Sequence, residues 1–329
     1  MSSTRSRYPN IALQSKNELA KRLSDRSHSF DERMAFIDDV KDNFDTYWHD
    51  TTASEAEEGK FVRSAKGKPL GELLYLLDKK LLSPHDVRLP PFIFGGVSGK
   101  SHLVAAQYLL GYKRQRTLLA LDIRRFYDQV GLARVETFFH TKAGCGERLA
   151  HLLAHFCCVP VGAKGSLSDN KVLARGFATS ARLAVWCNLD VFLRMNWLVQ
   201  RRLKGYDPRV AMFVDDIGIT ASRVPYELME HLRDEIIALF ATFDLNQPLP
   251  IHMEKTKILT YSEGIEHLGV KLNRKSLSFG RKTIKKRAGI IKALKVSPKG
   301  HHKKKPHDQL RSYGAYGRQI GKINSDTTT

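Results

Sequence analysis

The sequence predicts an α+β fold in which helices pack against an antiparallel sheet. Residues 118–123 form a short apolar run with an acid near its end, which is typical of a buried strand. Residues 210–214 and 217–220 are two more apolar runs, and only Asp215 and Asp216 separate them. We therefore expect a β-hairpin with both acids at its tip. A strand and a hairpin placed among helical segments favour an α+β domain.

The other elements follow from apolar periodicity in chain order. Leucine side chains at helical spacing predict a helix over residues 70–82 that packs on a core. Pro225 begins an amphipathic helix that extends to residue 243. Further helices are expected at 132–140, 146–157 and 179–203, and short strands at 257–260 and 267–272.

Length and composition limit the class of protein. The 329 residues are enough for about two domains, and 42% of them are hydrophobic, as in globular proteins. No apolar run reaches the roughly 18 residues of a membrane helix, and the N-terminus lacks the apolar region of a secretion signal. The four cysteines form no CxxC pair, which indicates free thiols in a reducing cytosol and argues against a zinc site. We expect a cytoplasmic protein without membrane contact.

Positive charge is concentrated at the C-terminus. The chain has 54 Lys and Arg against 34 Asp and Glu, a formal charge of +20, and residues 274–329 hold sixteen of these cations but only two acids. Such a segment suits the phosphate backbone of a nucleic acid. A membrane surface would also need a continuous apolar face, which is missing, and a solvated tail is the remaining alternative. The nucleic-acid contacts that we expect are Lys100, Lys285, Lys286, Arg287, Lys303, Lys304 and Lys305.

The acids of the hairpin have a further candidate partner in Asp122, at the end of the strand over 118–123. Turn geometry alone explains one Asp at a hairpin tip better than two. Two carboxylates held close together repel each other unless a cation neutralises them. If the strand lies beside the hairpin, Asp122, Asp215 and Asp216 converge, and such oxygen ligands suit Mg²⁺. Two such ions support phosphoryl transfer.

Five segments resemble the polymerase motifs of reverse transcriptases, in the order of that family. LDIRRFYD at 121–128 resembles motif A, RGFATSA at 175–181 motif B, and FVDD at 213–216 motif C. EKTKI at 254–258 is similar to motif D, and EHLGVKL at 266–272 to the primer grip, motif E. The resemblance extends over roughly residues 60–320, and motifs A and C together are its specific part.

Small bacterial members of the family are the most similar: retron reverse transcriptases and the unknown-group enzymes of antiphage defence. GGVSGKS at 95–101 resembles their finger loop and is not a Walker A loop, which would need Gly at Phe94. Motif B departs from the usual QGxPTSP by Arg175 and by the loss of both prolines, and motif C has Phe213 for Tyr. The NAxxH and VTG signatures of retrons are absent, which favours the unknown group.

The resemblance implies a right-hand polymerase with fingers, a palm with an antiparallel sheet and a short helical thumb. We expect an N-terminal helical extension at 1–59, interleaved fingers and palm at 60–273, and a basic thumb or C-terminal tail at 274–329. The implied reaction is attack of a primer 3′-hydroxyl on the α-phosphate of a dNTP, with two Mg²⁺ ions as cofactors.

The resemblance also implies roles for single residues. Tyr127 matches the steric gate against a ribose 2′-hydroxyl, although a plain core aromatic is the alternative. Lys255 matches a general acid toward pyrophosphate, although a plain surface lysine is the alternative. The implied metal ligands are Asp122, Asp215, Asp216 and the Ile123 carbonyl. The other implied nucleotide contacts are Arg175, Gly176, Arg63, Lys66 and Lys68, and the implied primer grip is His267, Leu268 and Gly269.

The implied partners are a structured noncoding RNA template, the RNA–DNA product and dNTPs. A second defence protein or a second copy of the chain is left open as a further partner. Two other functions also stay open: a template-independent or protein-primed DNA polymerase, and a non-catalytic RNA-binding scaffold beside a second reverse transcriptase. The intact acids argue against the scaffold, because buried carboxylates without a cation are costly.

Overall fold

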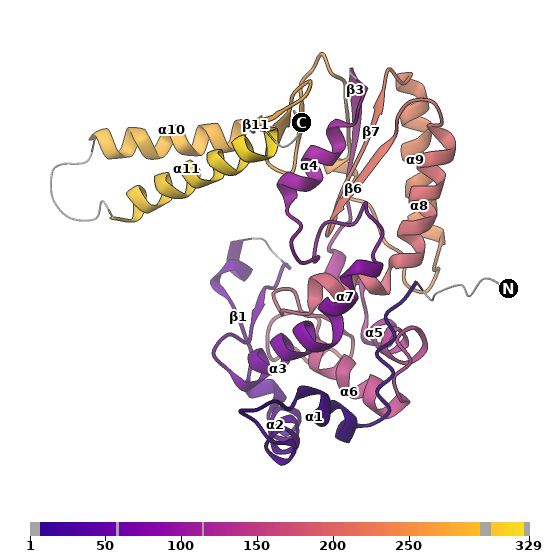
Figure 1. Ribbon diagram of the computed structural model, residues 1–329, viewed down its shortest axis with the longest axis vertical. Helices are drawn as coiled ribbons and strands as arrows, with labels where there is room; N and C mark the ends of the chain where they lie inside the picture. Colours follow the sequence, from indigo (N-terminus) through magenta and orange to yellow (C-terminus); the bar gives the residue numbers. More distant parts are fainter. Residues whose placement is uncertain (1–6, 57–58, 114, 297–303, 326–329) are drawn as a thin grey trace.

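The computed structural model in Figure 1 describes residues 7–56, 59–113, 115–296 and 304–325. Its centre is a four-stranded sheet in the order β6 (Arg209–Phe213), β7 (Asp216–Ser222), β3 (Arg116–Asp122) and β8 (Lys257–Leu259), with all three pairings antiparallel. The mixture of helices with antiparallel sheets confirms the α+β prediction. The predicted strand and hairpin are β3 and the pair β6–β7.

Alternating side chains of β3 enter two separate hydrophobic clusters, because successive residues of a strand point to opposite faces. Leu119 and Leu121 join the large cluster that also contains residues of α8 (Leu189–Arg202) and α9 (Tyr226–Thr242). Leu118 joins a smaller cluster with residues of α4 (His102–Leu110). Figure 1 accordingly shows α4 on one side of the sheet and α8 and α9 on the other.

The N-terminal and middle parts of the chain form a mainly helical region next to the sheet (Figure 1). Leu19 and Ile37, from the predicted extension at 1–59, pack in the same large cluster as β3. The elements of this helical region are α1 (Lys16–Leu23), α2 (Phe30–Asp42), α3 (Pro69–Leu77), α5 (Leu132–Thr137), α6 (Glu147–Cys157), α7 (Ser180–Cys187), and the strand pairs β1 (His49–Asp50) with β2 (Arg63–Ser64) and β4 (Cys158–Pro160) with β5 (Lys171–Leu173).

Two predicted elements are each divided in the structure. The helix expected over 179–203 is α7 and α8, separated at Asn188, whose φ of −114° lies outside the helical range. The strand expected over 267–272 is β9 (Ile265–His267) and β10 (Val270–Leu272), separated by a two-residue turn. Both residues of that turn have positive φ, 51° at Leu268 and 77° at Gly269, so the chain reverses there.

Two long antiparallel helices, α10 (Arg281–Val296) and α11 (Lys304–Ser325), extend away from the sheet (Figure 1). Among the described residues, the start of α10 and the end of α11 contact the body, and Arg281 donates its backbone N–H to Glu266 at 3.0 Å. Tyr316 stacks on His102 of α4, with ring centroids 5.6 Å apart, and Asn324 exchanges two hydrogen bonds with the backbone of Leu277 in β11 (Leu277–Phe279). None of the helices in the described ranges is both long and apolar enough to cross a membrane.

Candidate active site

The tip of the β6–β7 hairpin is a tight turn under backbone strain. Phe213 pairs with Asp216, so Val214 and Asp215 alone form the turn. Val214 has a φ of 62°, which is an outlier for a β-branched residue. Gly95 lies directly against the turn, because a Cβ at that position would be 2.1 Å from the Val214 nitrogen. The loop 95–101 therefore supports the hairpin tip, and strain of this kind is common at functional sites.

The register of the sheet brings the three predicted acids to one end of it. Asp122, the last residue of β3, pairs directly with Asp216, the first residue of β7. Opposite residues of an antiparallel pair present their side chains on the same face. The backbone N–H of Ile123 donates to the carbonyl oxygen of Asp215 at 3.0 Å, which fixes the turn to the end of β3. Asp122, Asp215, Asp216 and Ile123 are therefore neighbours, as the sequence predicted.

These carboxylates are crowded electrostatically. Burial, together with the charges of Asp215 and Asp122, raises the pKa of Asp216 to about 6. Burial and Asp122 also raise the pKa of Asp215, while Arg175 and Lys255 oppose that rise. The Lys255 ammonium lies 3.2 Å from Asp122 Oδ1, which brings this predicted residue into the site. Lys255 and Arg175 together offset two of the three negative charges, and the remaining negative charge favours binding of a cation.

The donor set fits Mg²⁺ when phosphate oxygens complete it. In the described parts of the chain, no group of three or more His, Cys, Asp or Glu side chains has the arrangement to hold a metal ion by itself. Mg²⁺ in nucleotide enzymes is usually held by one or two carboxylates together with substrate phosphates and water. Asp122, Asp215 and Asp216, whose repulsion a cation would relieve, are the residues that would hold it.

Tyr127 and Arg175 lie together beside the acids. Tyr127 belongs to the short 3₁₀ helix Phe126–Gln129 that follows β3, and the Arg175 guanidinium lies 5.4 Å from the centre of its ring. Burial raises the pKa of Tyr127 to about 12, and the nearby charge of Asp215 contributes to the rise. The ring therefore lies within electrostatic reach of Asp215, and its role as the gate stays a prediction.

Arg63 and Gly176 form a structural contact with each other. A Cβ at Gly176, whose φ is 102°, would lie 2.3 Å from the Arg63 carbonyl oxygen, so the glycine admits the backbone of β2. The Arg63 guanidinium lies 3.1 Å from Asp50 Oδ1 and donates to the carbonyl oxygens of Pro160 and Gly162. Both were predicted to contact the nucleotide. The Arg63 side chain thus connects β2 with β4, and the nucleotide contacts of Arg63 and Gly176 stay predictions.

A cavity of about 270 Å³ with several arginines in its lining lies next to Tyr127 and Arg175. Arg125 and Asp128 line it together with Arg63 and Arg175. Burial raises the pKa of Asp128, and the three arginines oppose the rise. Guanidinium groups bind phosphate oxygens with good geometry. Arg125 and Asp128 lie within motif A, but their motif position gave no sign that they line a cavity with Arg175, which comes from a distant segment.

The remaining predicted finger cations are outside this cluster. Lys66 and Lys68 are exposed on the loop before α3, where they line a separate groove with Glu72. Lys100 donates to the Ile93 carbonyl oxygen at 2.7 Å and is half-buried. Their predicted contacts with nucleotide or nucleic acid stay predictions.

The predicted primer grip has one buried and two accessible residues. Leu268 and Gly269 form the turn between β9 and β10, and Gly269 is exposed. His267 is buried against β7, where a Cβ at Gly218 would lie 2.7 Å from its Nε2. Burial lowers the pKa of His267 to about 4, so it is neutral at physiological pH. His267 therefore supports the turn from within the core, and only the turn can meet a primer.

The structure describes the side chains of only some of the basic residues predicted for the C-terminal thumb. Among the described side chains, those predicted on α10 are exposed and project into solvent. Lys303 lies outside the described residues, and Lys304 and Lys305 begin α11 with side chains that are not described. The exposed predicted contacts are Lys285, Lys286 and Arg287.

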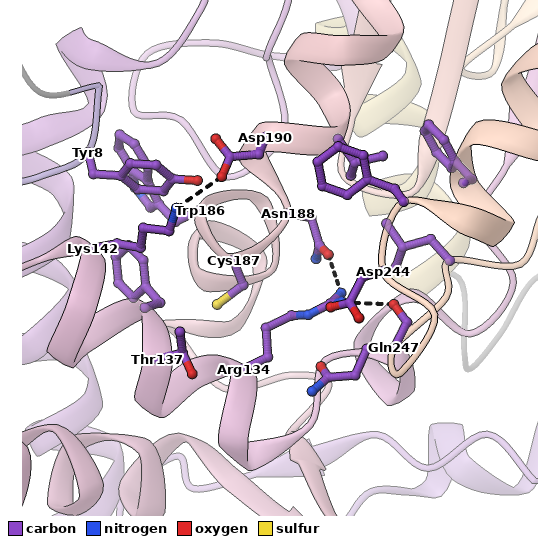
Figure 2. A pocket seen from close by; sticks show the side chains of 15 residues that line it. Tyr8, Arg134, Thr137, Lys142, Trp186, Cys187, Asn188, Asp190, Asp244 and Gln247 are labelled. Atoms are coloured by element: carbon purple, nitrogen blue, oxygen red, sulfur yellow. Dashed lines mark hydrogen bonds and ion pairs between the residues drawn. The ribbon is translucent and has the colours of Figure 1, made fainter.

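A second cavity, of about 180 Å³, was not predicted from the sequence (Figure 2). Arg134 lies at its centre and donates to Asn188 Oδ1 and Asp244 Oδ2, both at 2.6 Å, and to the Gln247 carbonyl oxygen at 2.7 Å. These bonds connect α5, the α7–α8 junction and the loop after α9. They explain why the helix expected over 179–203 breaks at Asn188, whose side chain is held by Arg134.

No protein-family model matches the chain, and no curated protein sequence matches it. Solved structures do match. One is telomerase from Candida albicans in complex with a TWJ fragment of telomeric RNA, at 10% identity and a TM-score of 0.41, over 65% of this chain and 38% of that chain. Another is apo telomerase from Candida tropicalis truncated from its C-terminal domain, at 11% identity and a TM-score of 0.41, over 64% and 45%. The chain spans less than half of either telomerase chain.

Proposed function

We propose that this chain is an RNA-directed DNA polymerase that uses two Mg²⁺ ions. The observation that carries the proposal is the direct pairing of Asp122 with Asp216, at the sheet end where Asp215 occupies the adjoining turn. Three half-buried acids whose charges repel one another would favour divalent cations and phosphates, and the basic cavity with Arg125 and Arg175 would take the triphosphate.

The residues of the site divide the chemistry among them. Asp122, Asp215 and Asp216 would hold Mg²⁺, which supplies charge stabilisation at the reacting phosphate and activates the attacking hydroxyl. Lys255, at 3.2 Å from Asp122, is placed to donate a proton toward the leaving pyrophosphate. Tyr127 restricts the space beside the acids and would exclude a ribose 2′-hydroxyl. Catalysis in such a site depends mainly on positioning and charge.

The finer parts of the proposal are supported by the motif resemblance. It favours a bacterial enzyme of the unknown-group, defence-associated class, with a structured noncoding RNA as template and cDNA as product. The exposed cations of α10 are consistent with a thumb that holds the RNA–DNA duplex. A second defence protein or a second copy of the chain is a further partner of this proposal.

The test is nucleotide incorporation by protein purified with its own nucleic acid. Labelled dNTPs, and separately NTPs, are added with Mg²⁺ to the wild type, to Asp215→Ala and to Asp234→Ala, which removes an exposed carboxylate on α9. We expect dNTP incorporation by the wild type and by Asp234→Ala, and its loss in Asp215→Ala and after RNase treatment. Sequencing of the bound RNA then identifies the template.

The other outcomes select between the remaining functions. Incorporation that survives RNase treatment, or that labels the protein itself, would favour untemplated or protein-primed synthesis. RNA that is bound without incorporation of either nucleotide class would contradict the enzyme and leave the scaffold.

A further inference from the structure

An exposed cluster on α8 lies apart from the candidate active site. Trp197 is 45% exposed, and the guanidinium carbons of Arg194 and Arg201 lie 4.4 Å and 5.2 Å from the centre of its indole ring. The three residues follow one another at spacings of three and four, so they occupy one face of the helix. We call them the α8 cluster.

The α8 cluster faces away from the sheet. Phe192, Met195 and Val199 of the same helix are fully buried in the large hydrophobic cluster. The sheet lies between α8 and the side that carries α4 and the thumb (Figure 1). A strand bound at the α8 cluster would therefore lie on the opposite side of the sheet from the duplex that α10 and α11 would hold.

Within the described residues, the two arginines of the α8 cluster have no acidic partner. No ion pair or side-chain hydrogen bond joins Arg194 or Arg201 to another residue in the described parts of the chain. The next arginine, Arg202, does have one, since it makes two hydrogen bonds of 2.6 Å and 2.9 Å to Glu235 of α9. Two guanidinium groups on one ring repel each other, and an anion between them would relieve the repulsion.

We propose that the α8 cluster binds a single-stranded segment of nucleic acid outside the candidate active site. Each guanidinium that turns to a phosphate uncovers indole surface on which a base can stack, and base–aromatic stacking with basic neighbours is the usual way of holding single strands. The net charge of +20 and the unpaired arginines favour a polyanion over a protein surface. The class of partner rests on the proposed polymerase function, because a template longer than the active site leaves single-stranded segments outside it.

Tryptophan fluorescence reports this site selectively. The chain has three tryptophans, and Trp48 and Trp186 are 3% and 0% exposed, so Trp197 is the accessible one. The wild type, without Mg²⁺ or dNTPs, is titrated with single-stranded RNA and DNA of about twelve nucleotides, the length of a typical binding site. Heparin serves as a polyanion without bases. We expect both oligonucleotides to quench the emission and heparin to leave it unchanged.

Variants of the same helix sharpen the test. Arg194→Ala with Arg201→Ala is expected to weaken the quenching titration by about tenfold and to lower its salt dependence by about two phosphate contacts. Arg202→Ala, whose arginine is paired with Glu235, is the matched control and should titrate as the wild type does. Trp197→Phe should remove the quenching while a labelled oligonucleotide shows whether binding itself is weakened.

Specific results would overturn the proposal. One is that heparin quenches Trp197 as strongly as the oligonucleotides do. Another is that oligonucleotide binds the wild type without quenching it, or that the double arginine variant keeps its affinity. Quenching by polyglutamate but not by oligonucleotides would point to a protein partner. The measurement uses no catalysis. If oligonucleotides quench Trp197 but the separate assay finds no dNTP incorporation, the polymerase proposal is contradicted and the α8 cluster proposal stands. If dNTPs are incorporated but Trp197 is not quenched, the α8 cluster proposal is contradicted and the polymerase proposal stands.

Discussion

At the scale of single residues, Asp216 combines burial with two negative neighbours, and this makes the stability of the metal-free protein dependent on pH. Its pKa rises from the ordinary 3.8 to about 6 on folding. The folded state therefore binds the proton more tightly than the unfolded state between these values. The contribution of Asp216 to stability is fully present below about pH 4 and is lost as the pH rises through about 6, because the half-buried carboxyl group must ionise.

Asp216→Asn should remove this cost. We expect the variant to be more stable than the metal-free wild type at neutral pH by on the order of 1–3 kcal/mol, and nearly equal to it in acid. Urea unfolding in EDTA across this pH range measures the difference. Asp234→Asn is the control: a hydrogen bond from Arg233 lowers the pKa of this exposed carboxyl group, so its removal should give no gain. A wild type whose stability rises from pH 4 to 6, with Asp216→Asn no better, would contradict the assigned crowding.

At the scale of elements, the backbone of the loop 95–101 packs directly against the backbone of the hairpin tip. Gly95 has no room for a Cβ, which would lie 2.1 Å from the Val214 nitrogen. Gly95→Ala must therefore displace the turn that carries Asp215 relative to the loop 95–101. A displacement of about 1 Å at a catalytic group can reduce turnover a hundredfold.

We expect Gly95→Ala to lower kcat for dNTP incorporation by about 10- to 100-fold, with circular dichroism and the overall fold retained. Gly131→Ala is the matched control, because a Cβ there would meet its nearest atom at an ordinary 3.8 Å. Single-turnover kinetics on a primed template measures the effect. A Gly95→Ala enzyme with unchanged kcat would show that the position of the turn does not matter to the chemistry.

The elements also show where prediction from the sequence succeeds and where it stops. The pattern of β3 and the hairpin predicted the sheet, because strands buried on both faces are read from local apolar runs. The break at Asn188 was not predictable, since it depends on Arg134 from another segment. Motif positions predicted that the acids meet, but not that Arg63 would be bound by Asp50 or that Arg125 and Asp128 would line a cavity. Such contacts are set by the tertiary fold.

At the scale of the whole molecule, charge and shape act together. The helices α10 and α11 of the proposed thumb project from the body, the described contacts with the body lie at the start of α10 and the end of α11, and exposed cations lie on α10. A surface of this kind adds affinity for a duplex without touching the reacting atoms. Binding should therefore depend on it more than chemistry does, and should depend on salt.

Replacing Lys285, Lys286 and Arg287 together with alanine tests this division. We expect the affinity for an RNA–DNA duplex to fall and the slope of log affinity against log salt to decrease by up to about 3, while single-nucleotide kcat at saturating duplex is unchanged. The products should also be shorter, because the enzyme dissociates sooner. Lys21, Arg22 and Arg26, exposed cations in the region of α1, are replaced in the control variant, which loses the same charge. If both triple variants lose affinity equally, net charge and not the thumb surface holds the duplex.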